Sequence, residues 1–429
     1  MDRRKFLAVS LASTALSACG GGGGSTDSSV VSSSSVSSAS GVWSQLAAQL
    51  SGSVVLPGQN DYEGLRRVYN TRFDHIKPVA VVRCTTAQDV QATLAFARTQ
   101  QLAIVPRSGG HGYAGYSATE GIVLDLGQMN SIRIGPGTAI IGAGAKLVDI
   151  YDQLGAQGVG IPAGSCPTVG IGGLTLGGGI GIVDRAYGLT CDNLLAAEVV
   201  LADGRIIQCD ADNHPDLFWA LRGGGGGNFG VVTRFTFKTH TAADITTFDS
   251  YFDFNDFINV MQAWQAWPET LPPHIWAQAI PAWNSRFNAP ALQIRAFCIG
   301  SIADMAPHWE HFLQQSSATP LWVGKVTEPY RKVMSSGCGG FSVPACHVQG
   351  YSPQGRYPRN AFAASSDFFA KAMPEAGLLV LKQAILDSQL TGKFGMMIMD
   401  LMRGAIDELA ADETAFVHRG ALFSVEYYT

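Results

Sequence analysis

The sequence predicts an α+β protein in which helices and strands are interleaved up to about residue 240, followed by longer, aromatic-rich elements. Apolar runs of strand length alternate with segments of helical periodicity in the first part. The 50 glycines gather in clusters and have no fixed period, which excludes a fibrous protein. With 429 residues, 46% of them hydrophobic, the chain can form one large domain or two ordinary ones. We place the boundary between the two parts near residues 241–247.

Local signals fix several elements of the first part. Thr86 and Asp89 are spaced as a capping box, which predicts that a helix begins there. Asp203-Gly204 predicts the turn of a hairpin. The predicted strands are 79–83, 102–106, 122–126, 138–142, 198–201, 206–208 and 231–238. The predicted helices are 86–97, 146–157 and 216–222, and 254–267 is the first of the longer elements.

The amino terminus is predicted to direct export. Arg3-Arg4 precedes an apolar run, 6–18, that is too short to span a bilayer and is similar to a twin-arginine signal. Residues 16–19, Leu-Ser-Ala-Cys, resemble a bacterial lipobox, which would make Cys19 the lipidated first residue; the alternative is an ordinary leader with a chance cysteine. We expect a signal at 1–19, a Gly/Ser-rich linker at 20–42, and a lipid-anchored protein on the periplasmic side of the bacterial cell envelope.

Charge and cysteine spacing exclude some classes of function. The net charge of −5 gives no reason to expect a nucleic-acid partner. Cys338 and Cys346 could close a short disulfide loop in an oxidising compartment, although spacing alone does not fix connectivity. The sequence has no C-x-x-C pair or histidine cluster that would indicate a metal site, and no G-x-x-x-x-G-K-[ST] run of a nucleotide hydrolase.

Two glycine-rich turns point to a large cofactor, because glycine lets the backbone approach a ligand closely. Residues 107–112, Arg-Ser-Gly-Gly-His-Gly, follow a predicted strand and can direct backbone N–H groups at a diphosphate. His111 at the end of this turn could reach the ligand, or could be a turn residue only. The segment 170–181 contains seven glycines, and Cys166 ahead of it is either a nucleophile or a small buried hydrophobe.

A third cluster, 225–230, matches the string G-x-G-x-x-G but not the structure that this string requires. A dinucleotide fold places a strand before it and a helix after it, whereas here a predicted helix precedes it and a predicted strand follows. We therefore interpret it as a turn that leads a strand past the cofactor.

Taken together, these segments resemble the berberine-bridge-enzyme-like branch of the vanillyl-alcohol-oxidase/PCMH flavoproteins. The resemblance covers 62–240 and 416–427, and its most specific motifs are 107–111, 166–170 and 216–225. It implies FAD bound covalently to both His111 and Cys166. It also implies a PCMH-type FAD-binding domain of two α+β subdomains, which we place at 43–242.

The resemblance implies a substrate domain at 243–429, with an antiparallel sheet backed by helices. Family members continue past the position of Thr429 with a further segment, so we expect this chain to end short of it. That loss would expose apolar surface and could abolish activity.

The resemblance also assigns the site residues. Glu426 is expected to accept the substrate proton, with Tyr113 lining the pocket, although Glu426 could instead be a surface carboxylate; Tyr427 and Tyr428 are secondary candidates. Val169 is small enough to admit oxygen to the flavin, which implies an oxidase. The expected cofactor contacts are Arg107, Ser108, Gly109, Gly110, His111, Gly112, Ser117, Cys166, Val169, Gly170, Gly173, Gly177, Gly178, Gly181, Gly230 and Val232.

The expected function is oxidation of a small alcohol, sugar or amine-type substrate by hydride transfer to FAD, with molecular oxygen as the electron acceptor. One alternative is a dehydrogenase that passes electrons to a quinone or a protein. Another is an envelope lipoprotein that binds flavin without turnover. Four tryptophans could stack on a substrate ring or could belong to the core: Trp264, Trp267, Trp276 and Trp283.

Overall fold

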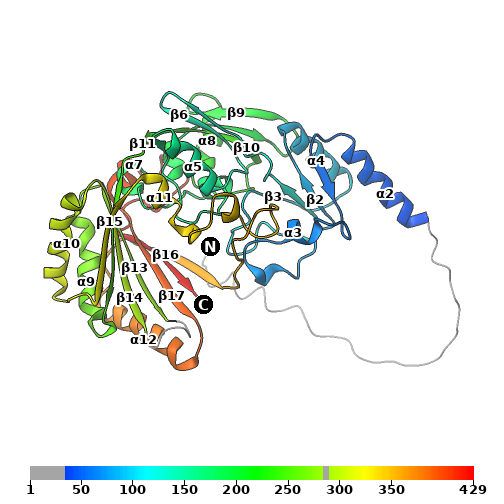
Figure 1. Ribbon diagram of the computed structural model, residues 1–429. Helices are drawn as coiled ribbons and strands as arrows, with labels where there is room; N and C mark the ends of the chain where they lie inside the picture. The colour runs from blue at the N-terminus through cyan, green and yellow to red at the C-terminus, as the bar shows by residue number, and fades with distance from the viewer. Residues whose placement is uncertain (1–33, 284–288) are drawn as a thin grey trace, which may run out of the picture. The chain divides into compact units, whose positions relative to one another are not determined.

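The computed structural model describes residues 34–283 and 289–429 (Figure 1). Contacts divide the chain into two compact units, Met1–Trp43 and Ser44–Thr429, and the fold described below is that of the second. The predicted signal at 1–19, with Arg3, Arg4 and Cys19, lies outside the described residues. Within the described ranges, no helix is both long and apolar enough to cross a bilayer.

The first described helix corrects the predicted linker. Helix α2 spans Ser34–Ala47, so the end of the segment 20–42 is helical and not a structureless tether. Leu46, in the last turn of α2, is buried. Burial of this apolar side chain stabilises a helical turn that glycine and serine content alone does not predict.

Two sheets make up the part of the fold before residue 240. A four-stranded sheet has the order β1-β2-β4-β3, with β1 antiparallel and the other neighbours parallel. An antiparallel five-stranded sheet has the order β5-β6-β10-β8-β9. The strands are β1 (Ser53–Val55), β2 (Ala80–Arg83), β3 (Ile104–Arg107), β4 (Ile122–Asp125), β5 (Ile132–Gly135), β6 (Thr138–Gly142), β8 (Leu194–Val200), β9 (Ile206–Asp210) and β10 (Val231–Lys238).

Helices connect and cover these strands. The capping box at Thr86 and Asp89 forms as predicted and begins helix α4. The predicted hairpin is also confirmed, because β8 pairs with β9 across residues 201–205. The helices are α3 (Tyr62–Arg66), α4 (Ala87–Thr99), α5 (Leu147–Ala156), α6 (Ile171–Leu176), α7 (Asp184–Tyr187) and α8 (Pro215–Leu221), and a short pair joins β7 (Val159–Gly160) to β11 (His240–Thr241).

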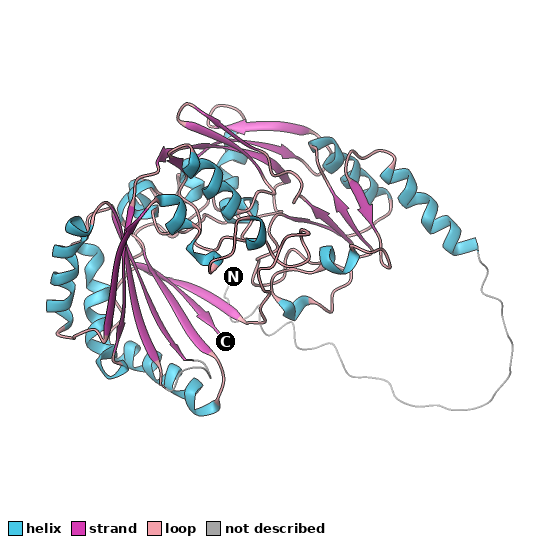
Figure 2. Cartoon of the chain, viewed as in Figure 1, coloured by secondary structure: helices cyan, strands magenta, loops and turns pink. Residues whose placement is uncertain are grey.

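The remaining strands form one antiparallel seven-stranded sheet with the order β15-β12-β14-β13-β17-β18-β16. Its helices lie against one face (Figure 1, Figure 2). The strands are β12 (Ile245–Phe252), β13 (Ile275–Trp283), β14 (Ala291–Ile299), β15 (Trp322–Glu328), β16 (Ala364–Phe369), β17 (Gly395–Leu401) and β18 (Phe423–Tyr428). The helices on that face are α9 (Phe257–Ala266), α10 (Ile302–Ser316) and α12 (Glu375–Thr391), whereas α11 (Tyr330–Met334) packs against α5. The α+β class and the helix-backed antiparallel sheet are confirmed.

The core of this second part fills the space between the sheet and its helices. Trp264 of α9, Trp309 of α10 and Phe423 of β18 belong to it. The four tryptophans at 264, 267, 276 and 283 are all buried. Those at 264, 267 and 283 belong to the core between the sheet and its helices, whereas Trp276 alternates with the core residues Ile275 and Ala277 of β13. Cys338 and Cys346 form a disulfide, as their spacing allowed. The predicted boundary at 242/243 falls between β11 and β12 and stays a prediction.

Strand alternation leaves the opposite face of the seven-stranded sheet free for polar residues. Val425 and Phe423 of β18 point into the helix-covered core. Ser424 and Glu426 therefore point to the other face, together with Asp400, which pairs with Ser424. This helix-free face carries one side of the site.

Candidate active site

The two glycine-rich turns predicted to bind a cofactor contact each other directly. A side chain added at Gly109 would collide with the backbone of Gly170, and one added at Gly170 would collide with Ser108. Ser108 Oγ donates to the carbonyl of Ala143 (2.5 Å) and accepts from the N–H of Gly172 (3.3 Å). Glycine at 109 and 170 is thus required for the close approach of two segments 61 positions apart.

The buried side chain of Arg107 anchors the start of the first glycine-rich turn through hydrogen bonds. Its guanidinium is buried and donates to Asp125 Oδ2 (2.5 Å from Nη2) and to the carbonyl of Leu65 (2.5 Å). Burial acts against charge on both groups, but the ion pair raises the pKa of Arg107 and lowers that of Asp125. The side chain is therefore occupied by protein groups, and any contact of Arg107 with a cofactor would come from its backbone.

His111 is fixed at the end of the first turn by two neighbours. Its ring stacks on Tyr69, with centroids 4.2 Å apart, and its Nε2 lies 2.9 Å from Thr168 Oγ1. Burial, and then the nearby Lys146 cation, lowers the pKa of His111 to about 3. The ring is neutral at physiological pH, which leaves a nitrogen lone pair available for bonding. The hydrogen bond also places His111 beside the turn that carries Cys166.

Cys166 is the one exposed free cysteine among the described residues. The surrounding protein, and then the Glu426 carboxylate, raises the pKa of its thiol to about 11. The residue is exposed, and the raised pKa indicates a neutral thiol in the protein alone. The electrostatic effect of Glu426 on Cys166 also shows that the second turn lies near β18.

Lys146 was not predicted as a site residue, and its side chain contacts the first glycine-rich turn. Its Nζ donates to the carbonyls of Ser108 (2.7 Å) and Gly144 (2.8 Å). Burial lowers its pKa to about 8, although Asp125 opposes that shift. Nothing in the sequence around Lys146 indicates that it contacts the first glycine-rich turn. That contact depends on how separate turns pack together in the fold.

Glu426 and Tyr113, the two predicted catalytic residues, contact each other although 313 positions separate them. Tyr113 donates to Glu426 Oε2 (3.1 Å), and Tyr428 donates to the same oxygen (2.6 Å). The two tyrosine hydroxyls also contact each other. Burial and the Glu426 charge raise the pKa of both tyrosines, so both are neutral hydrogen-bond donors. Tyr428, a secondary candidate, thus joins the pair.

Asp400 is a second carboxyl group on the same face, and the sequence analysis missed it. Gln278 Nε2 donates to its Oδ1 (2.7 Å). Burial, and then Glu426, raises the pKa of Asp400 to about 7. A lone acid in the apolar run 395–401 was the available signal, because buried strands seldom carry a charge.

The raised pKa of Asp400 predicts a pH dependence of stability. Its pKa is about 7 in the folded protein, well above the ordinary aspartate value of 3.8, so between these values the folded state binds the extra proton. The free energy of unfolding should therefore fall as pH rises through this window. Asp400→Asn cannot ionise, so we expect a smaller fall between about pH 4 and pH 7 in denaturant unfolding. Exposed Asp412→Asn is the control; equal falls in D400N and wild type would contradict the prediction.

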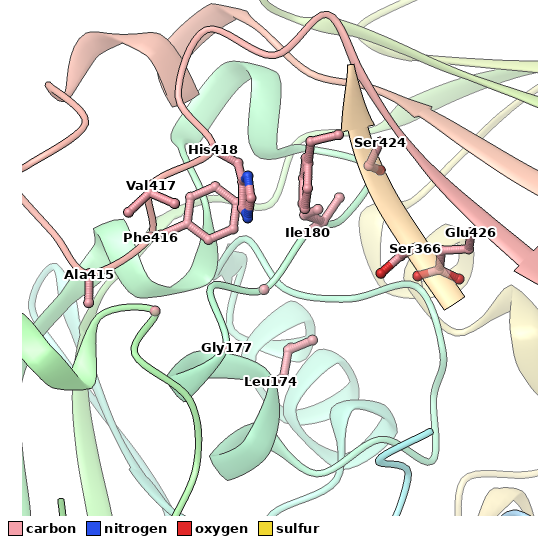
Figure 3. Close-up of a pocket in the computed structure, with 13 residues that line it drawn as sticks. Leu174, Gly177, Ile180, Ser366, Ala415, Phe416, Val417, His418, Ser424 and Glu426 are labelled. Carbon is pink, nitrogen blue, oxygen red and sulfur yellow. The ribbon is translucent and has the colours of Figure 1, made fainter. Parts of the chain in front are cut away.

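A pocket of about 520 Å³ lies between the glycine-rich segment and strands β16 and β18. Figure 3 shows Glu426 and Ser366 at one side, with the His418 ring and Ile180 toward the other. The lining residues are Leu174, Gly177, Gly179, Ile180, Gly223, Ser366, Phe368, Ala415, Phe416, Val417, His418, Ser424 and Glu426. Of the site residues predicted from the sequence, Gly177 and Glu426 line this pocket.

The loop at 415–418 was identified as a motif but not as part of the site. His418 stacks on Phe368, with centroids 4.0 Å apart. The loop is held by Arg419, which is buried and donates to both carboxylate oxygens of Asp192 (2.8 and 2.6 Å). This buried ion pair fixes one wall of the pocket against the segment that follows the glycine run.

Three of the predicted glycines face space and not protein. A side chain added at Gly112 or Gly173 would meet nothing within 4 Å, and one at Gly177 only the carbonyls of its own turn. None of the three has a positive φ, so neither packing nor backbone conformation requires glycine there. Gly173 lies in α6 and Gly177 is the C-cap one turn later, so neither position adds a side chain to that side of the helix end. These positions fit a large ligand lying against the backbone.

The other predicted contacts have reasons within the protein. A side chain at Gly178 would meet Phe416 at 2.6 Å, and one at Gly230 would meet Val199 at 2.8 Å. Gly110 has φ +69°, which favours glycine regardless of any ligand. Gly181 packs on Ala163, Val232 is buried in β10, Val169 is half-buried, and Ser117 lies half-buried in the loop after Tyr113. Their contact with a cofactor stays a prediction.

Comparison with known proteins agrees with this geometry. Residues 78–210 match the model of the FAD binding domain family. An uncharacterised FAD-linked oxidoreductase of Bacillus subtilis, YgaK, is 31% identical over 388 residues, or 89% of this chain and 81% of that protein. The chitooligosaccharide oxidase of Gibberella zeae is 30% identical over 383 residues, or 84% of this chain and 72% of that protein.

A solved structure extends the similarity to the fold. The berberine-bridge-enzyme-like protein 1 of Physcomitrella patens superposes with a TM-score of 0.81 at 29% identity, over 90% of this chain and 83% of that one. The match covers both the glycine-rich turns and the seven-stranded sheet, because it spans nearly the whole described chain. The chain belongs to the berberine-bridge-enzyme-like FAD-linked oxidoreductases of the PCMH/vanillyl-alcohol-oxidase superfamily.

Proposed function

We propose that this protein is an oxidase that carries FAD on His111 and Cys166 and removes a hydride and a proton from a small alcohol, sugar or amine. The observation that carries the proposal is the cluster of Tyr113, Glu426 and Tyr428, which lies within electrostatic reach of Cys166. A proton acceptor is thus held beside the turn expected to hold the flavin, which is the arrangement that hydride removal requires.

Double attachment is supported by the surroundings of the two residues. His111 is neutral, and its Nε2 lies against the turn of Cys166 through Thr168. Cys166 is an exposed residue with a free thiol. A side chain added at Gly112 or Gly173 would meet nothing within 4 Å, so a large group could lie against the backbone there. In the proposed complex, His111 would hold the 8α-methyl carbon of the flavin and Cys166 its C6 position.

Residues of this chain would accept the substrate proton, while FAD, when bound, supplies the hydride acceptor. Glu426 would accept the proton of the substrate hydroxyl or amine. Hydrogen bonds from Tyr113 and Tyr428 to a single oxygen fix the orientation of the carboxylate. Asp400, with a pKa of about 7, is protonated over much of the acidic range and then adds no second negative charge beside Glu426.

Oxygen is the proposed electron acceptor. The substrate loses two electrons and two protons, and oxygen gains both to become hydrogen peroxide. Val169 supports this choice, because its side chain is short and only half-buried, and its N–H binds the carbonyl of Cys166 at 3.2 Å. A bulkier side chain at position 169 would occupy space that oxygen needs to approach the flavin.

Peroxide release across a panel of alcohols, sugars and amines tests the proposed function. We expect stoichiometric peroxide with at least one hydroxyl-bearing substrate. Turnover that occurs only with an artificial electron acceptor would contradict the oxidase and favour a dehydrogenase. Bound flavin with no turnover of any compound would favour a non-catalytic envelope protein.

Export and lipid attachment complete the proposal. The twin-arginine pattern at Arg3-Arg4 and the lipobox ending at Cys19 support it. The Cys338–Cys346 disulfide supports it independently, because such bonds persist in oxidising compartments such as the periplasm. Metabolic labelling with a fatty acid, lost in Cys19→Ala, would test the anchor.

A further inference from the structure

The connection from β15 to β16 leaves the seven-stranded sheet and packs against α5. The two strands are the opposite edges of that sheet, and residues 329–363 join them. Arg331 Nη2 lies 2.5 Å from Asp152 Oδ1, and His347 Nε2 lies 3.0 Å from Asp149 Oδ1. Because the two acids are three residues apart, they lie on one face of the helix. The connection therefore lies along this face of α5.

The Cys338–Cys346 disulfide closes a loop within this connection, which we call the disulfide loop. Both cysteines are buried and form a small apolar cluster with Val148 of α5. Gly339 and Gly340 inside the loop have positive φ, and a side chain added at either would meet nothing within 4 Å. Such a backbone has many conformations open to it once the covalent bond is removed.

Gly337, which precedes the disulfide loop, lies against the turn that carries Cys166. A side chain added at Gly337 would meet Cδ of Pro167 at 2.8 Å and the carbonyl oxygen of Ser165 at 3.3 Å. The φ of Gly337 is not positive, so this contact, and not the backbone conformation, requires glycine there. The contact involves both neighbours of Cys166 in the sequence.

The first residues of α5 hold the same turn by hydrogen bonds. The N–H of Leu147 donates to the carbonyl of Val169 (3.0 Å), and the N–H of Val148 donates to the carbonyl of Pro167 (2.9 Å). Val148 also packs on the two cysteines of the disulfide. The turn is thus held between α5 and the start of the disulfide loop, and the disulfide lies where these two elements meet.

The turn that carries His111 is held by other groups. Arg107 anchors it through Asp125, and Tyr69 stacks on the His111 ring. None of these residues belongs to the disulfide loop. Loss of the disulfide should therefore disturb Cys166 more than His111.

We propose that the Cys338–Cys346 disulfide positions Cys166 for its bond to the flavin, so that this bond depends on an oxidising compartment. The inference rests on the proposed function for the bond itself. Bond formation replaces one S–H bond and one C–H bond by an S–C bond, and oxygen takes up the two hydrogen atoms as hydrogen peroxide. A disulfide of this kind persists outside the cytoplasm and is rare within it.

Removal of the disulfide in two backgrounds tests the proposal. Only the Cys166 bond can retain FAD in His111→Ala, and only the His111 bond in Cys166→Ala. In H111A, Cys338→Ala with Cys346→Ala should lower the FAD-bearing fraction of denatured chain at least about fivefold by intact mass, because a misplacement of about 1 Å can slow a reaction about 10²-fold. In C166A the fraction should change less than about twofold. Equal losses in both backgrounds, or no loss in H111A, would overturn the proposal.

Gly337→Ala tests the contact while the disulfide is intact. Its added carbon would meet Pro167, so the turn must shift, and we expect the same selective loss of FAD in the H111A background. Phe341→Ala is the matched control, because Phe341 is 43% exposed and lies within the disulfide loop. F341A should retain as much FAD as H111A alone. Full retention in G337A would show that Cys166 does not depend on this contact and would overturn the proposal.

Hydrogen exchange separates this inference from the proposed function, because it needs no flavin. In Cys338→Ala with Cys346→Ala, the amide of Val148 should exchange at least about tenfold faster than in wild type, whereas that of Val90 in α4 should not change. Faster exchange at Val148 in a protein without covalent FAD would keep the positioning role and reject the double attachment. Unchanged exchange at Val148 would overturn the positioning role, whether or not FAD is attached.

Discussion

Replacing Glu426 by Gln should slow reduction of the bound flavin by about 10²- to 10⁴-fold, the usual contribution of a positioned general base. Glutamine keeps the size of the side chain and an oxygen that can accept from Tyr113 and Tyr428. It cannot take the proton of a hydroxyl group. The chemical step therefore loses its proton acceptor, while the pocket keeps its shape.

Anaerobic stopped-flow mixing with the best substrate of the panel measures this step directly. Asp367→Asn is the matched control, because Asp367 is an exposed acid of the neighbouring strand β16 and pairs with Val425. D367N should reduce at the wild-type rate. If E426Q also reduces within about twofold of wild type, Glu426 is a surface carboxylate and not the base.

Arg107→Met should cost about 3 to 5 kcal/mol of unfolding free energy, because it leaves the carboxylate of Asp125 buried and unpaired. The side chains of Arg107 and Asp125 are only 1% and 11% exposed, and the guanidinium also satisfies the carbonyl of Leu65. Methionine fills the space but donates no hydrogen bond. The first glycine turn would then lose its support from β4.

Arg205→Met provides a matched control for this prediction. Arg205 pairs with Asp203, but the two side chains are 67% and 52% exposed, so the change should cost less than about 1 kcal/mol. Denaturant unfolding of both variants measures the difference. A loss in R107M no larger than that in R205M would show that the buried pair does not support the turn.

Local signals in the sequence were enough to predict many elements of the fold. The capping box at Thr86 and the Asp203-Gly204 turn each depend on a few adjacent residues, and both form as predicted. The disulfide closes a loop with a sequence separation of only 8. The contact of Tyr113 with Glu426 is not local and followed from the family resemblance, which carries the tertiary arrangement with it.

The features that were missed depend on register and on burial. Asp400 lies beside Glu426 only because β17 and β18 pair with a particular offset, which the sequence of either strand does not specify. Lys146 reaches Ser108 across two separate turns. The tryptophans at 264 and 267 were ambiguous because an aromatic stripe suits a core as well as a ligand, and only the packing of α9 against the sheet decides between them.

The central claim is that one FAD is joined to this chain through an imidazole and a thiol. The intact mass of the denatured protein tests it most directly. We predict a mass one FAD above that of the polypeptide for wild type, and also for His111→Ala and Cys166→Ala singly, because either bond is sufficient to retain the cofactor. The double variant should have the mass of the polypeptide alone. A wild-type chain that loses all of its flavin on denaturation would contradict the account.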